Sequence, residues 1–167
     1  KILYDLRHVL GDEDIVISDV GMHKLWLARL YPAYRPNTVI ISNGFATMGI
    51  SLPGAIAAKL VRPNRHVVAV CGDGSFMMNS QELETAKRLG LAFVVLIFND
   101  GKYGMIEWKQ VNQFGKPFGM SFGNPDFVKY AESFGCVGLR VKKTKDLLPM
   151  LKEAIKIKNV VIIAVPV

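Results

Sequence analysis

The chain has 167 residues, of which 50% are hydrophobic and 21% charged, so it can bury a sizeable core and is not a disordered segment. It contains no apolar run near the roughly 18 residues that a membrane span needs, and its start lacks a signal-peptide pattern, which favours a cytoplasmic protein with no membrane partner. The net charge is +7, but the densest basic run, Lys142 to Lys145, has no interleaved aromatic residues, so we expect a solvated surface and no nucleic-acid partner.

Short apolar runs alternate with helical periodicity along the whole chain. Strands are expected at Ile15–Ser18, Val39–Ser42, His66–Cys71, Phe93–Phe98, Val137–Val141 and Val160–Val165, and helices around residues 2–10, 22–30, 48–61, 77–89, 125–134 and 145–157. This pattern predicts an α/β fold, a three-layer sandwich with a mostly parallel sheet of about six strands and helices on both faces. Residues 1–167 are expected to form a single domain, with a long functional loop from Val111 to Asn124.

A glycine-rich turn follows the third expected strand. The apolar run that ends at Cys71 continues into Gly72-Asp73-Gly74-Ser75 and then into a helix. Backbone N–H groups at such a turn bind anions, and glycines allow a phosphate to approach the backbone closely. A carboxylate at Asp73 would repel a diphosphate unless a cation lies between them, and Mg²⁺ commonly bridges carboxylates to phosphates.

A second carboxylate follows the next strand. Asp100 lies in the sequence Asn99-Asp100-Gly101-Lys102-Tyr103-Gly104, directly after the run that ends at Phe98. Because ligands in such sheets bind where parallel strands end, Asp73 and Asp100 could both reach one cation. Taken alone, the Gly-Asp-Gly turn is equally compatible with ordinary turn chemistry; the second acidic strand end favours the metal site.

These residues resemble the signature of enzymes that depend on thiamine diphosphate, which in most members reads Gly-Asp-Gly followed at this spacing by Asn-Asn. The second Asn is Asp100 in this chain, a change that keeps an oxygen ligand. The resemblance implies thiamine diphosphate and Mg²⁺ as cofactors. It also implies that the metal ligands are Asp73, Asp100 and the backbone carbonyl of Lys102.

The resemblance extends over nearly the whole chain. The segment from Ser18 to Trp26 resembles the loop of acetolactate synthases that approaches the cofactor diphosphate, and the segment from Ser42 to Gly49 resembles the loop beneath the cofactor rings, with Met48 as the wedge. Without the resemblance, Met48 would simply open the following helix. The implied cofactor-binding residues are Gly21, Met22, His23, Ala46, Met48, Gly72, Gly74, Ser75, Tyr103, Gly104 and Met105.

The flanking segments narrow the resemblance to acetolactate synthases, which condense two pyruvate molecules into 2-acetolactate and release CO₂. The residues from Gln81 to Leu89 and from Phe122 to Gly135 look like the catabolic enzymes, while Gly72 to Asn79 is closer to the anabolic acetohydroxyacid synthases. Anabolic members carry a Trp that aligns with Lys109, one position after Trp108. An anabolic enzyme, a pyruvate oxidase and a glyoxylate carboligase remain alternatives.

The resemblance also implies that the site is incomplete in this chain. In the family, the glutamate that activates the cofactor lies on a separate pyrimidine-binding domain of a partner subunit, so we assign no catalytic residue here, and Glu82, Glu84 and Glu107 are not assigned that role. We therefore expect a homo-oligomer, a C-terminal piece of a longer enzyme, and no activity from this piece alone. A nicotinamide-binding domain is disfavoured because the chain lacks a G-x-G-x-x-G turn near its start, and a non-catalytic relative would have little reason to keep both aspartates.

Overall fold

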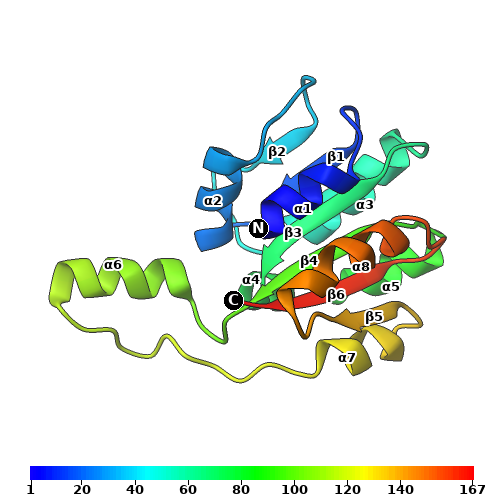
Figure 1. Ribbon diagram of the computed structural model, residues 1–167. Coiled ribbons are helices and arrows are strands. Elements are labelled where there is room, and N and C mark those ends of the chain that lie inside the picture. Colours follow the sequence, from blue (N-terminus) through cyan, green and yellow to red (C-terminus); the bar gives the residue numbers. More distant parts are fainter.

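Six parallel strands form one sheet, and helices cover both of its faces (Figure 1). The computed structural model describes residues 1–167. The strands are β1 (Ile15–Ser18), β2 (Val39–Ile41), β3 (Val67–Gly72), β4 (Val94–Asn99), β5 (Val137–Arg140) and β6 (Val161–Pro166), in the order β2-β1-β3-β4-β6-β5. The helices are α1 (Ile2–Val9), α2 (Met22–Leu30), α3 (Ser51–Val61), α4 (Asp73–Met78), α5 (Glu82–Arg88), α6 (Gly104–Phe114), α7 (Phe127–Ser133) and α8 (Leu147–Ala154), with a 3₁₀ turn η1 (Thr144–Asp146) before α8.

Two hydrophobic layers enclose the sheet because successive side chains of a strand point to opposite faces. Val68, Val70 and Leu96 pack with the buried residues of α1, α2 and α8. Ala69 and Val95 lie on the other face and pack with residues of α3, α4, α5 and α7. The predicted three-layer α/β fold is therefore confirmed, and every strand of the sheet is parallel to its neighbours.

The strand predictions are correct to within one or two residues at each end. Two helix predictions were wrong in detail. The helix expected over 77–89 is two helices, α4 and α5, because the backbone leaves the helical conformation at Asn79. The side chain of Asn79 donates a hydrogen bond to the backbone carbonyl of Gly49. The helix expected from residue 48 begins at Ser51, because Gly49 has a φ of 90° that no regular helix contains.

The loop predicted from Val111 to Asn124 begins later than expected. Residues Val111 to Phe114 belong to α6, which ends at Gly115 with a left-handed φ of 75°. None of the residues of α6 is buried, and the helix projects away from the sheet before an extended segment returns to α7 (Figure 1). The base of this excursion is closed by two backbone hydrogen bonds, from Tyr103 N to Met120 O and from Phe122 N to Gly101 O, each 3.0 Å long.

The apolar segments of the chain are strands and short helices. No helix has the length and hydrophobicity needed to cross a bilayer.

Candidate functional site

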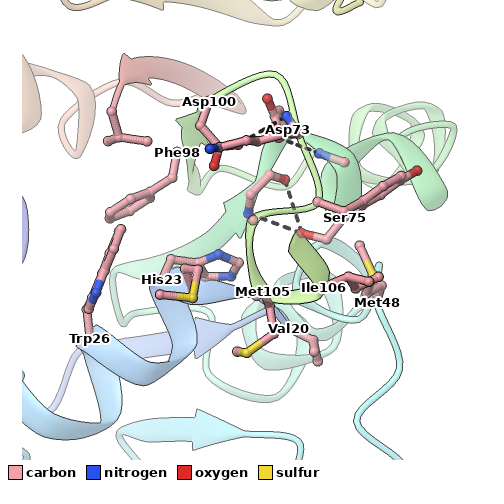
Figure 2. A pocket seen from close by; sticks show the side chains of 18 residues that line it. Val20, His23, Trp26, Met48, Asp73, Ser75, Phe98, Asp100, Met105 and Ile106 are labelled. Atoms are coloured by element: carbon pink, nitrogen blue, oxygen red, sulfur yellow. Dashed lines mark hydrogen bonds between the residues drawn. The ribbon is translucent and has the colours of Figure 1, made fainter. Parts of the chain in front are cut away.

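A pocket of about 100 Å³ lies where β1, β3 and β4 end. Its walls include residues from the loop after β1, the turn after β3 and the segment after β4 (Figure 2). All but one of the residues singled out from the sequence line it; they are Gly21, Met22, His23, Met48, Gly72, Asp73, Gly74, Ser75, Asp100, Lys102, Tyr103, Gly104 and Met105. Ala46 does not line the pocket. It lies two residues before Met48, in the loop before α3, and has a left-handed φ of 52°.

Sequence reasoning missed an aromatic and aliphatic part of the wall, formed by Val20, Trp26, Phe98, Ile106 and Val167. The rings of Trp26 and Phe98 are tilted against each other with centroids 6.0 Å apart. A signal for Trp26 was available, because it follows His23 by three residues and so shares a helix face with it. Phe98 could not be separated by pattern from the rest of the buried strand β4.

Asp73 occupies the first position of α4, directly after β3, and is 1% exposed. Its Oδ1 accepts a hydrogen bond from its neighbour Gly74 N at 2.8 Å. Its Oδ2 accepts from Gly101 N at 2.7 Å and from Asn124 Nδ2 at 2.7 Å. These donors satisfy a buried carboxylate and attach the segment after β4 to the turn after β3.

Asp100 lies at the end of the neighbouring strand, since β3 and β4 pair in parallel with Gly72 opposite Phe98. Burial, and then the negative charge of Asp73, raise the pKa of the Asp100 carboxyl above its usual range. The two carboxylates repel each other at these adjoining strand ends, and a cation bound between them would relieve this repulsion. The fit to a hard cation is good because its preferred ligands are oxygens.

No group of three or more His, Cys, Asp or Glu side chains is arranged to hold a metal ion. A cation between Asp73 and Asp100 would therefore need backbone or ligand oxygens to complete its shell. The Lys102 carbonyl is suited to this because it accepts no backbone hydrogen bond. The Lys102 ammonium is engaged elsewhere, in an ion pair of 2.5 Å with Glu107.

His23 is the most unusual polar group of the pocket. Its side chain is 3% exposed and its Nε2 atom is buried without any hydrogen-bond partner. Burial lowers the pKa of His23 to about 4, against the opposing effect of Asp19. Because an unpartnered buried nitrogen is costly, it marks a place where a polar ligand group fits.

Glycines leave room for this ring. A Cβ atom on Gly21 would lie 2.8 Å from His23 Cε1, and one on Gly72 would lie 3.4 Å from His23 Nδ1. A Cβ on Gly74 would lie 2.7 Å from Tyr103 Cε1, so the Tyr103 ring covers the turn. The hydroxyl of Ser75 caps this turn, accepting from Gly72 N at 3.1 Å and donating to Gly72 O at 3.0 Å.

Met48 lies across the pocket from His23 and Trp26 (Figure 2). It precedes α3, which begins at Ser51, so Met48 does not open that helix. None of the glutamates set aside in the sequence lines the pocket: Glu82, Glu84 and Glu107.

Three known proteins that are similar to this chain are named as acetolactate synthases. The chain is 42% identical over 167 residues to an acetolactate synthase of Bacillus subtilis, with 100% of the chain and 29% of that protein covered. It is 41% identical over 171 residues to a catabolic acetolactate synthase of Raoultella terrigena, with 99% of the chain and 31% of that protein covered. A probable acetolactate synthase large subunit of Methanococcus aeolicus is 35% identical over 162 residues, with 93% of the chain and 27% of that protein covered.

The chain thus spans less than a third of the length of these relatives. A family model described as the thiamine pyrophosphate enzyme C-terminal TPP-binding domain matches residues 19–165, a span that holds every pocket residue except Val167. Thiamine pyrophosphate is another name for thiamine diphosphate. The chain belongs to the family of C-terminal TPP-binding domains of thiamine pyrophosphate enzymes.

Proposed function

We propose that this chain is the part of an acetolactate synthase that binds thiamine diphosphate and Mg²⁺, in an enzyme that condenses two pyruvate molecules to 2-acetolactate and releases CO₂. The observation that carries the proposal is the meeting of Asp73 and Asp100 at adjoining strand ends, beside the unpartnered Nε2 of His23. The similarity to acetolactate synthases over the whole chain supports the choice of reaction.

Asp73, Asp100 and the Lys102 carbonyl would hold the metal ion. With its single proton on Nε2, the neutral imidazole of His23 would donate to a diphosphate oxygen, and the backbone of Gly72 to Ser75 lies in the same pocket. Met22, Gly104 and Met105 form the wall near these groups. The buried donors on Asp73 keep its carboxylate fixed while a cation binds.

The apolar wall would receive the cofactor rings. Met48 lies on one side of the pocket, and Trp26 and Phe98 lie on the other (Figure 2). An apolar wall around the reacting centre excludes water and strengthens electrostatic interactions there. When bound, the cofactor supplies a nucleophilic carbon and an electron sink for decarboxylation, while the protein supplies position and electrostatics.

The pocket contains no glutamate. We propose that the group that activates the cofactor comes from a pyrimidine-binding domain of a second subunit, so the working enzyme is a homo-oligomer in the cytoplasm and residues 1–167 are inactive alone. The catabolic reaction is our first choice over the anabolic one, because the catabolic relative is 41% identical over 99% of this chain. Product analysis of the full-length enzyme that contains this chain, with pyruvate and with pyruvate plus 2-ketobutyrate, separates these two and also detects an oxidase or a glyoxylate carboligase.

The test of the metal and cofactor site is titration calorimetry of thiamine diphosphate into the full-length enzyme that contains this chain, at several Mg²⁺ concentrations. Asp73→Asn keeps the size of the side chain but removes the charge, so we expect at least a tenfold loss of affinity and a raised Mg²⁺ requirement. Asp126→Asn is the matched control, because Asp126 also accepts from a backbone N–H at a helix start but lies outside the pocket. Unchanged affinity and unchanged Mg²⁺ dependence in a folded Asp73→Asn protein would show that Asp73 is not a metal ligand.

A further inference from the structure

Asp19 is a buried carboxylate that the proposed chemistry does not use. It follows β1 directly and is 0% exposed, yet it does not line the pocket. Its Oδ1 accepts from Val20 N and Gly49 N, and its Oδ2 accepts from Ser51 N, each at 2.8 Å. Hydrogen bonds to an ionised acceptor are roughly twice as strong as neutral ones, so a buried carboxylate with three donors is a firm connection.

The donors come from two segments that contribute to the pocket. Val20 begins the loop that leads to His23, while Gly49 and Ser51 flank the end of the loop that carries Met48. Some 30 residues separate Asp19 from Gly49, so this is a tertiary contact and not a local turn. Asp19 therefore joins one wall of the pocket to the opposite wall.

A second contact holds the same loop from the other side. The carbonyl of Gly49 accepts from Asn79 Nδ2 at 3.0 Å, and Asn79 ends α4, the helix that begins at the Asp73 turn. Both backbone polar atoms of Gly49 are thus fixed by side chains. Gly49 and Ala46 have left-handed φ values of 90° and 52°, so regular secondary structure does not set the place of Met48 between them.

We propose that Asp19 is a positioning residue of the cofactor pocket: it holds the loop that carries Met48 at a fixed place relative to His23 and the Asp73 turn. The inference rests on the proposed function, because a preformed pocket matters only if a cofactor binds there. Preorganisation lowers the ordering cost of binding, so loss of the connection should weaken cofactor binding without removing any group that touches the cofactor.

Asp19→Asn is the sharpest perturbation. The amide group keeps one accepting oxygen, but its NH₂ must face at least one of the three backbone donors, so at least one hydrogen bond is lost. Asp14→Asn is the matched control, because Asp14 precedes the same strand and accepts from Gly11 N at 2.8 Å and His66 N at 2.9 Å, at the end of the sheet away from the pocket.

Two measurements on the full-length enzyme that contains this chain test the proposal. Without ligand, hydrogen exchange of residues 43–51 should be at least tenfold faster in Asp19→Asn, while Asp14→Asn matches the wild type there. With Mg²⁺, the dissociation constant and KM of thiamine diphosphate should rise at least tenfold in Asp19→Asn, with kcat at saturating cofactor within about twofold of wild type, because binding alone is affected.

Asn79→Ala removes the second contact on Gly49 and leaves Asp19 intact, so it should shift both measurements in the same direction to a smaller extent. If Asp19→Asn does not fold, Asn79→Ala is the variant that tests whether fixing the loop at Gly49 affects cofactor binding. The positioning role is overturned if exchange and affinity stay at wild-type values, or if Asp14→Asn loses affinity equally, which would indicate general destabilisation. If the wild-type full-length enzyme binds no thiamine diphosphate, the proposed function fails and the positioning role fails with it. If the wild type binds and Asp19→Asn binds equally well, only the positioning role fails.

Discussion

Replacing His23 by glutamine should remove the part of the loss of folding stability at acidic pH that comes from protonation of His23. The His23 ring is 3% exposed, and burial lowers its pKa from 6.5 to about 4. The unfolded chain therefore binds a proton as the pH falls below 6.5, whereas the folded chain does not until the pH nears 4. The stability that comes from the neutral ring is complete above pH 6.5 and is lost as the pH falls through this window.

The size of this effect follows from the two pKa values. A difference of one pKa unit corresponds to about 1.4 kcal/mol, so the free energy of unfolding should fall by roughly 2.5 kcal/mol between pH 7 and pH 4.5 on account of His23 alone. Urea unfolding followed by circular dichroism, repeated across this pH range, measures it as the difference between wild type and His23→Gln. Carboxylates contribute equally to both proteins and cancel.

His66→Gln is the control for the substitution itself, because the His66 side chain is exposed whereas the His23 ring is buried. Parallel pH profiles for wild type and His23→Gln would refute the reasoning, because they would mean that the folded chain accepts a proton on His23 as readily as the unfolded chain does.

Three further predictions concern other parts of the fold. Asp100→Asn should raise the melting temperature of the ligand-free chain at pH 7, because burial and the charge of Asp73 raise the pKa of Asp100, and the gain should vanish in calorimetry at a pH low enough to protonate that carboxyl. Gly138→Ala should lower the free energy of unfolding in urea by about 3 kcal/mol or more, because the added Cβ would lie 2.5 Å from Val128 O. Gly123→Ala should lower it far less, because nothing lies within 4 Å of a Cβ at Gly123. Equal losses of stability in the two variants would contradict this prediction. Amides of α6 should exchange much faster than those of β4, since α6 buries no residue; equal protection by mass spectrometry would count against local opening.

Much of the fold could be predicted because its signals are local. Two-sided apolar runs such as Val67 to Cys71 identify buried parallel strands, and the alternation of strands with helices predicts a sheet with both faces covered. The carboxyl ends of strands are where ligands bind in this architecture, so Asp73 and Asp100 could be placed at one edge before any coordinates were known. The individual cofactor-binding residues after β1, β3 and β4 were implied by the resemblance to thiamine-diphosphate enzymes, and they lie at the edge of the sheet that this rule names.

The tertiary structure decided what depends on contacts between distant segments. Nothing near Asn124 in the sequence indicates that its amide donates to Asp73, 51 residues away. The break at Asn79 and the late start of α3 likewise come from side chains that bind the backbone of Gly49 from other elements.

The sequence by itself determined the fold class, the strands and the two acidic strand ends, because hydrophobic periodicity and turn chemistry act over a few residues. Only the tertiary structure decided which groups surround them: the unpartnered Nε2 of His23, the Trp26 and Phe98 wall, and the connection through Asp19. These features arise when separate elements dock, since burial changes the pKa of a histidine and brings a carboxylate to backbone donors that no local pattern specifies.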